Sequence, residues 1–132
     1  VDAGLLDLLV RTRLRPVLVV HTNHPREIDA IVRAALERLA TAGVTLLNQS
    51  VLLRGVNDSA TVLAELSETL FSARVLPYYL HLLDPVRGAA HFDVNKTEAS
   101  AIIKALRQRL PGYLAPRLVR EQPGQPAKTL VE

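Results

Sequence analysis

The sequence predicts an α/β fold, in which parallel strands alternate with helices that cover them. Short runs rich in Val, Leu and Ile alternate along the chain with longer amphipathic runs. The apolar runs begin about thirty residues apart, which is the length of a strand–helix–strand crossover. The chain has 132 residues, of which 48% are hydrophobic, so it can form one packed domain. Alternation of this kind is typical of a parallel sheet covered by helices.

The first half of the chain is expected to contain two strands and a helix between them. Residues 15–21 form a Val-rich run without polar alternation, which indicates a strand buried on both faces. A helix is expected over residues 25–43, because apolar residues recur at helical spacing, Pro25 opens the run and Gly43 closes it. Residues 44–53 are a second apolar run and the second expected strand.

The second half is expected to continue the alternation. Its elements are, in order, helix 57–73, strand 74–83, helix 95–112 and two short strands, 113–121 and 128–132. Asp58 or Ser59 is expected to cap the first of these helices, and Thr97 the second. Tyr78 and Tyr79 are expected to point to opposite faces of their strand, because neighbouring residues of a strand alternate.

Polar side chains occur where each expected strand gives way to its loop. They are His21, Asn23 and His24 after the first strand, Asn48, Gln49 and Ser50 in the second, His81 and Asp84 after the third, and Arg120 and Glu121 after the fourth. Ligands of barrels and open α/β sheets bind at the carboxyl ends of the strands. Loop starts are commonly polar, but Asn48 and Gln49 lie inside an apolar run, where a polar pair needs a partner. The set therefore predicts one site at this edge.

Lysine is scarce in this chain, with three lysines against thirteen arginines. Lys128 lies in the Gly/Pro-rich segment EQPGQPAKTL. Lysine, unlike arginine, can lose its proton in a protein and form a Schiff base. Lys128 is therefore either a residue with a chemical role or a surface charge.

Composition disfavours several classes of protein. The net charge of +3 and the 4% aromatic content argue against nucleic-acid binding. There is no cysteine, no apolar run of membrane-spanning length and no visible signal peptide, so we expect a cytoplasmic protein without a membrane partner. His21 and His24 have the spacing of metal ligands, but no local carboxylate or cysteine completes a set, and no metal site is expected within this chain. The chain has no methionine and opens on what resembles the end of a helix, so we expect a fragment of a longer polypeptide.

Four segments resemble the C-terminal portion of the lysine 2,3-aminomutase family. They are HTNHPREI, NQSVLLRGVND, LPYYLHLLDPVRGAAHF and GYLAPRLVRE followed by AKTL, and the second is highly specific. Members of this family are radical S-adenosylmethionine enzymes that also use pyridoxal phosphate. The resemblance implies that residues 1–112 are the second half of a partial (βα) barrel, and that residues 113–132 are a further strand and a tail that binds pyridoxal phosphate.

The resemblance also implies roles for five residues. His21 and Gln49 match positions that contact S-adenosylmethionine. Asp84 and Glu121 match two acidic positions that hold the ammonium group of the substrate side chain, although the catabolic enzymes have aspartate where this chain has Glu121. Lys128 matches the lysine that holds pyridoxal phosphate.

The implied activity is that of an isomerase that converts L-lysine to β-lysine. It requires a [4Fe–4S] cluster held by three cysteines of a CxxxCxxC loop, so we expect the 132 residues to be inactive without a missing N-terminal half of the same barrel. The segment HLLDPVRGAAHF and the short tail after Lys128 are most similar to the branch that makes β-lysine for elongation factor P. An aminomutase of free lysine or another basic amino acid, and a non-catalytic α/β binding module, are the alternatives; a homo-oligomer is compatible with each.

Overall fold

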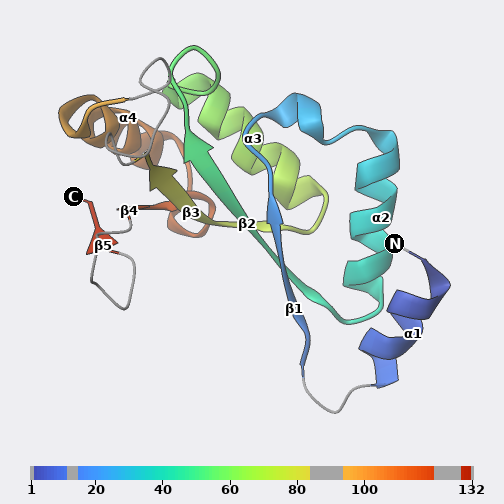
Figure 1. Ribbon diagram of the computed structural model, residues 1–132. Coiled ribbons are helices and arrows are strands. Elements are labelled where there is room, and N and C mark those ends of the chain that lie inside the picture. The colour runs from blue at the N-terminus through green and yellow to red at the C-terminus, as the bar shows by residue number, and fades with distance from the viewer. Residues whose placement is uncertain (1, 12–14, 84–93, 121–128, 132) are drawn as a thin grey trace.

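The computed structural model describes residues 2–11, 15–83, 94–120 and 129–131. In these residues, five strands form one sheet in the order β1-β2-β3-β4-β5 (Figure 1). The elements, in chain order, are α1 (Ala3–Arg11), β1 (Val17–His21), a 3-10 turn η1 (Pro25–Glu27), α2 (Ala30–Thr41), β2 (Thr45–Leu52), α3 (Ala60–Ser72), β3 (Leu76–Leu82), α4 (Lys96–Arg109), a 3-10 turn η3 (Gly112–Leu114), β4 (Arg117–Arg120) and β5 (Thr129–Leu130).

The first four strands are parallel, and each pairs with the next one along the chain. β5 runs antiparallel to β4. The connections between the parallel strands pass through α2, α3 and α4, which lie on the same side of the sheet (Figure 1). The α/β prediction is therefore confirmed, and no helix of the described residues covers the opposite face of the sheet.

The start of α2 differs from the prediction. Asp29 caps this helix, because its carboxylate accepts a hydrogen bond from the backbone N–H of Val32 at 2.8 Å. Pro25 opens the separate turn η1 instead, so the expected helix start at Pro25 was wrong. Ile28, between the turn and the helix, leaves helical geometry and is buried in the core. The expected end is confirmed, because Gly43 follows the helix with a φ of 92° that favours glycine.

The other two long helices are also capped by side chains. Ser59 caps α3 by accepting the backbone N–H three residues further on (3.1 Å), whereas Asp58 accepts the N–H of Gly55 in the preceding turn (3.0 Å). Asn95 caps α4 in the same way as Ser59 (2.8 Å). Thr97 lies inside the first turn of α4, so the prediction that it caps the helix was wrong.

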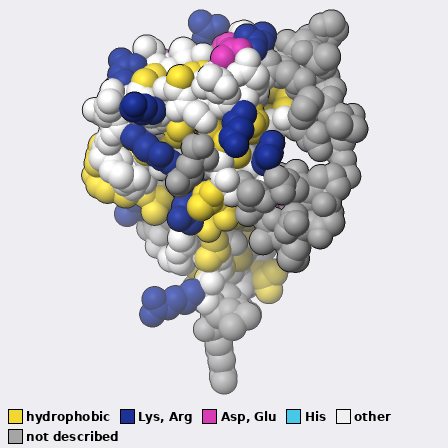
Figure 2. Space-filling view, turned by 90° about the vertical axis from the view of Figure 1, so that its left-hand side faces the viewer, with side chains coloured by type: hydrophobic (Ala, Val, Ile, Leu, Met, Phe, Trp, Pro, Cys, Tyr) yellow, Lys and Arg dark blue, Asp and Glu magenta, His cyan; other side chains and the backbone are white. Residues whose placement is uncertain are grey.

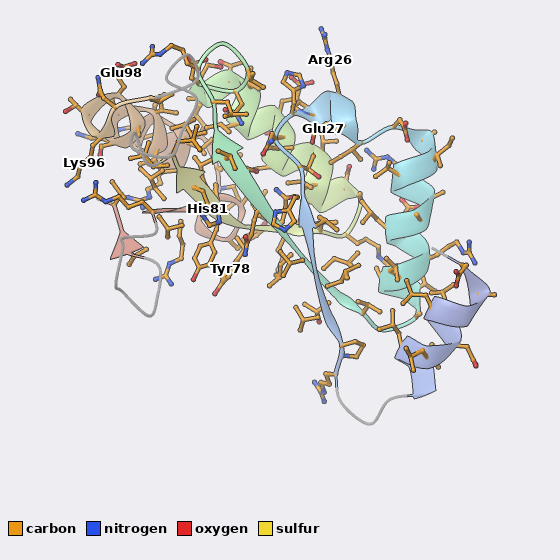
Figure 3. The ribbon with its side chains drawn as sticks, in the orientation of Figure 1. Arg26, Glu27, Tyr78, His81, Lys96 and Glu98 are labelled. Carbon is orange, nitrogen blue, oxygen red and sulfur yellow. The ribbon has the colours of Figure 1, made fainter. Side chains whose placement is uncertain are left out.

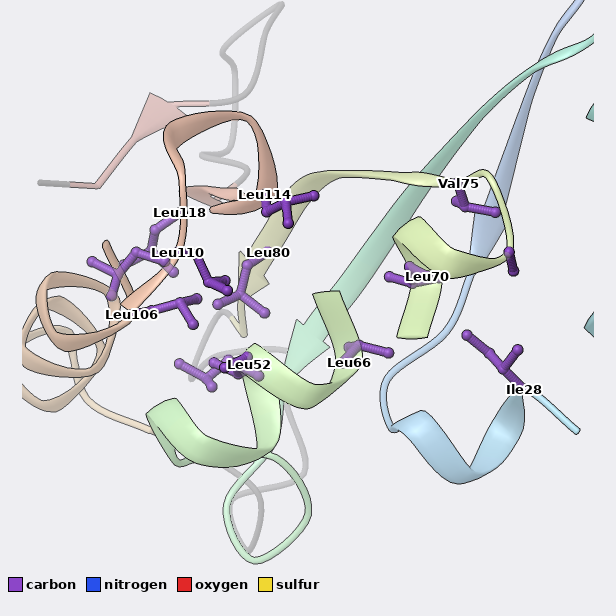
Figure 4. Close-up of a cluster of buried hydrophobic side chains, with 14 of the residues drawn as sticks. Ile28, Leu52, Leu66, Leu70, Val75, Leu80, Leu106, Leu110, Leu114 and Leu118 are labelled. Atoms are coloured by element: carbon purple, nitrogen blue, oxygen red, sulfur yellow. The ribbon is translucent and has the colours of Figure 1, made fainter. Parts of the chain in front are cut away.

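The hydrophobic core lies between the helices and the covered face of the sheet (Figure 4). It joins leucines of α3 to apolar side chains of β2, β3, α4 and β4 and of the segments next to them. The core residues labelled in Figure 4 are Ile28, Leu52, Leu66, Leu70, Val75, Leu80, Leu106, Leu110, Leu114 and Leu118. Each fully buried leucine stabilises the fold by about 1.5–3 kcal/mol relative to an exposed one. The core therefore fixes the strands from one side only.

One irregularity interrupts the pairing of β2 and β3. Asn48 is paired with Pro77, but the next residue, Gln49, is paired with Tyr79, so Tyr78 is an extra residue in β3. An insertion of this kind is a β-bulge, which resets the alternation of the two faces. The two leucines that follow in β3 are buried as a result.

Positive charge gathers on the side of the molecule formed by α4 and β4. Lys104, Arg107 and Arg117 are exposed there, and Figure 2, which views this side, shows more basic than acidic side chains. In the described part of the chain, no helix is both long enough and apolar enough to cross a membrane.

Candidate active site on the open face of the sheet

The face of the sheet that the helices leave uncovered carries the candidate site. In β1, Val17, Val19 and His21 are exposed, whereas Leu18 and Val20 between them are half-buried and pack against the core, so the expectation that this strand is buried on both faces was wrong. Because successive residues of a strand point to opposite faces, the exposed set marks the open face. His21 is the last residue of β1 and thus stands at the carboxyl end of the strand, where ligands of parallel sheets bind.

The strand register places four polar residues in one row across the sheet. His21 is paired with Gln49, Gln49 with Tyr79, and Tyr79 with Arg117, so that each of the four parallel strands contributes one residue. His21 and Gln49, two of the five site residues expected from the sequence, are therefore neighbours. The side chains of His21 and Arg117 are exposed, and those of Gln49 and Tyr79 are half-buried.

The two tyrosines of β3 lie together. The ring centroids of Tyr78 and Tyr79 are 4.2 Å apart, and the ring planes are inclined by 34°. The expectation that these rings point to opposite faces was wrong, because the β-bulge at Tyr78 interrupts the regular alternation. Aromatic surface thus gathers where β3 contributes to the polar row, and Figure 3 labels Tyr78 and His81 of this strand.

His81 is joined to the polar row by a hydrogen bond. Its Nε2 atom lies 3.2 Å from Oε1 of Gln49, and both side chains are half-buried. An amide oxygen can only accept, so Nε2 of His81 carries the proton in this contact. The ring of Tyr79 meets the imidazole edge-on, with centroids 5.9 Å apart and planes inclined by 78°. His81 is thereby held between an aromatic ring and the amide of Gln49.

The buried amide of Asn48 anchors the chain that leaves β1. Nδ2 of Asn48 donates to the backbone carbonyl of Thr22 (3.1 Å) and to the hydroxyl of Ser50 (2.9 Å). The hydroxyl of Ser50 donates to the same carbonyl (2.7 Å). These bonds explain why polar residues occur inside the apolar run of β2, and they fix the position of His21 directly before Thr22. Oδ1 of Asn48 accepts no hydrogen bond from the described residues.

Asn57 connects the loops after β1 and β2. This residue is fully buried, and its Nδ2 atom donates to the carbonyls of Asn23 (2.8 Å) and Val51 (2.9 Å). Its Oδ1 atom accepts the N–H of Leu53 (2.8 Å). The side chain of Asn23 adds a bond in the opposite direction, because its Oδ1 accepts the N–H of Val51 (2.8 Å). The carboxyl ends of β1 and β2 are therefore tied to each other by amides.

The other three expected site residues, Asp84, Glu121 and Lys128, lie outside the described residues. The strands that precede two of them are described: β3 ends at Leu82 and β4 at Arg120. Both strands are parallel to β1 and β2, so the carboxyl ends of all four strands lie at the same edge of the sheet.

Two further side chains near the strand ends have structural roles. Nδ1 of His24 accepts the N–H of Arg26 (3.1 Å) and so begins the turn η1. Arg54 forms an ion pair with Glu98 of α4 at 3.2 Å. Sequence reasoning noted His81 only as a polar residue near a strand end and overlooked Asn57. For Asn57, the available signal was a short amide in a glycine-containing loop, where such side chains commonly bond to the backbone.

Metal ligands do not converge in the described part of the chain, where no three His, Asp or Glu side chains are grouped so as to hold an ion. The described face offers imidazole and amide hydrogen-bonding groups beside aromatic and apolar surface. Groups of this kind are suited to hold an organic ligand that has both polar and apolar parts.

Comparison with known proteins finds close relatives. The chain is 55% identical over 123 residues to an L-lysine 2,3-aminomutase of Haemophilus influenzae, which covers 93% of the chain and 36% of the relative. It is 51% identical to the L-lysine 2,3-aminomutase of Escherichia coli, over 98% of the chain and 38% of the relative. It is 45% identical to that of Clostridium subterminale, over 86% of the chain and 27% of the relative. The chain thus spans between 27% and 38% of the length of these curated relatives.

A solved structure shares the fold. A radical SAM methyltransferase from Sphaerobacter thermophilus matches 90% of this chain and 38% of its own chain with a TM-score of 0.62, at 21% sequence identity. At this identity the likeness establishes the fold alone. No protein-family model matches the chain.

Proposed function

We propose that this chain, which belongs to the lysine 2,3-aminomutase family over the segment that it spans, is part of an isomerase that moves the amino group of L-lysine from the α-carbon to the β-carbon. The observation that carries the proposal is the identity of 45–55% to three L-lysine 2,3-aminomutases along 93–98% of the chain. The parallel sheet with an open face agrees with it, because the radical SAM neighbour has the same fold.

His21 and Gln49 are proposed to hold S-adenosylmethionine. They are paired in register at the carboxyl end of neighbouring strands, on the open face. S-adenosylmethionine has a flat base, hydroxyls and a carboxylate. An imidazole and an amide beside the exposed Val19 and the ring of Tyr79, which is paired with Gln49, offer hydrogen bonds and apolar surface that fit such a molecule.

Lys128, Asp84 and Glu121 are proposed to complete the site. Lys128 would hold pyridoxal phosphate through its amine, since lysine and not arginine can form that bond. Asp84 follows β3 and Glu121 follows β4, which are adjacent parallel strands. Two acids that converge on the side-chain ammonium of lysine would each contribute a charged hydrogen bond of about 1.5–3 kcal/mol. A neutral substrate would leave both acids unpaired, so the pair would select a basic amino acid.

When bound, S-adenosylmethionine with an iron–sulfur cluster supplies a radical that removes hydrogen from the substrate, and pyridoxal phosphate supplies the carrier for the migrating amino group. The residues of this chain bind and orient these groups. The chain contains no cysteine, so cluster ligands would come from residues outside it.

The test is to express the complete reading frame that contains this chain and to reconstitute it anaerobically with iron, sulfide and pyridoxal phosphate. We expect formation of β-lysine from L-lysine, measured by mass spectrometry, only with S-adenosylmethionine and a reductant. A matched Gln49→Ala variant should lose most of this activity. Binding of the cofactors without any turnover of lysine, ornithine or arginine would contradict the proposal and favour a binding module.

We further propose that the β-lysine serves the modification of elongation factor P, which would place the enzyme in the cytoplasm. The support is the similarity of HLLDPVRGAAHF and of the short tail after Lys128 to that branch. Deleting the gene in its own host should remove the β-lysyl mass from elongation factor P, and supplied β-lysine should restore it. An unchanged mass of elongation factor P, with growth on lysine lost, would indicate an aminomutase of lysine catabolism instead.

A further inference from the structure

We infer that His81 is a positioning residue that fixes the side-chain amide of Gln49, so that its NH2 group is presented as a donor to the ligand on the open face. The inference rests on the proposed function in one respect, namely that Gln49 contacts S-adenosylmethionine. It goes beyond that function because it assigns a role to a residue that makes no proposed contact with the ligand.

The first step concerns the two ends of the amide. Nε2 of His81 donates to Oε1 of Gln49 at 3.2 Å, so the oxygen end is engaged within the protein. Among the described residues, the NH2 end of Gln49 has no hydrogen-bond acceptor. A terminal amide can rotate by half a turn at little cost when both ends are free. The bond to His81 removes this freedom and leaves the donor end for an acceptor such as a carboxylate or a hydroxyl.

The second step concerns what holds His81. Its ring meets the ring of Tyr79 edge-on, with centroids 5.9 Å apart, and the ring centroids of Tyr79 and Tyr78 are 4.2 Å apart. His81 and Val51 are partners in the register of β3 and β2, two residues nearer the carboxyl end than the pair Gln49 and Tyr79. The imidazole therefore reaches Gln49 diagonally across two paired strands, from a position that backbone pairing and the ring of Tyr79 support.

The third step concerns magnitude. Immobilising one flexible side chain on binding costs about 0.5–1.5 kcal/mol, which corresponds to about two- to tenfold in affinity. If His81 holds Gln49 in advance, this cost is absent from ligand binding. Removing the N–H of His81 should therefore weaken binding by about two- to tenfold.

The experiment measures the Kd of S-adenosylmethionine by equilibrium dialysis, on the complete, anaerobically reconstituted protein. His81→Phe keeps a ring against Tyr79 but removes the donor, and should weaken binding by about two- to tenfold. His81→Gln restores an N–H at a similar reach and should recover most of the affinity. In a Gln49→Ala background, His81→Phe should have no further effect, because no amide remains to be positioned.

The outcomes separate the two proposals. If Gln49→Ala leaves the Kd unchanged, the assignment of Gln49 to the S-adenosylmethionine site is wrong, and the role of His81 is refuted with it. If Gln49→Ala weakens binding but His81→Phe does not, only the role of His81 is refuted. An equal effect of His81→Phe with and without Gln49 also refutes positioning, since His81 then acts independently. Should His81→Phe fail to fold, as judged by circular dichroism, His81→Leu replaces it in the same cycle.

Discussion

Asn57 is the residue of the candidate site whose replacement we expect to cost most stability. Its side chain is fully buried and holds three backbone groups, namely the carbonyls of Asn23 and Val51 and the N–H of Leu53. Each buried group that loses its partner costs about 1–3 kcal/mol, and part of this is recovered by water or by rearrangement, so Asn57→Ala should destabilise by about 3–5 kcal/mol. This is a large fraction of the roughly 5–15 kcal/mol that stabilises a typical domain.

Equilibrium urea unfolding of the complete protein and hydrogen exchange at single amides would measure this effect. The amide of Leu53 should exchange faster in Asn57→Ala, because its hydrogen-bond acceptor is removed. Asn95→Ala is the matched control, because it removes an exposed helix-capping amide worth about 1 kcal/mol. The reasoning is refuted if Asn57→Ala costs no more than the control, or if exchange at Leu53 is unchanged.

Four further predictions follow from other parts of the molecule. Leu80→Ala should lower the free energy of unfolding by about 2–5 kcal/mol, because this leucine is 1% exposed in the core; a loss below about 1 kcal/mol in thermal unfolding would contradict the packing described. The ion pair of Arg54 and Glu98, whose side chains are 45% and 43% exposed, should give a coupling below about 1 kcal/mol in a double-mutant cycle, and a much larger value would mean that the pair is desolvated. Lys128→Arg should keep the charge but abolish retention of pyridoxal phosphate on desalting, monitored by visible absorbance; retention equal to that of the parent would exclude Lys128 as the attachment point. Asp84→Asn should raise the KM for lysine by at least about tenfold, as expected for a charged pair that loses one partner, and an unaltered KM would remove Asp84 from the substrate site.

The sequence predicted the order of the parallel strands and helices because each element carries a local signal. Apolar runs such as residues 15–21 and the helical spacing before Gly43 depend only on neighbouring residues. The start of α2 could not be predicted in this way, because burial of Ile28 decides where the chain leaves the turn η1. Local chemistry did offer Asn95 as a cap for α4, yet Thr97 also fits the preference for caps, and only the backbone distinguishes them.

The candidate site shows the same division between local and distant causes. That His21 and Gln49 lie at one edge of the sheet was expected from the rule that ligands bind at the carboxyl ends of parallel strands. The bond between Gln49 and His81 did not follow, because it depends on the register of two strands that are 32 residues apart at these positions. Polarity inside β2 was recognised as needing partners, but the carbonyl of Thr22, which accepts from Asn48, carries no sequence signal of its own.

The extra residue of β3 has a consequence for comparing this chain with its relatives. Tyr78 occupies a position that has no counterpart in the pairing with β2, so a homologous strand can lose it without losing any hydrogen-bonded pair. In such a homologue, the residues aligned with Pro77 and Tyr79 would be consecutive in sequence, and the gap would have to be placed between them. An alignment that puts the gap elsewhere in β3 would equate core leucines with residues of the open face, and would transfer the role of His81 to a residue that points the other way.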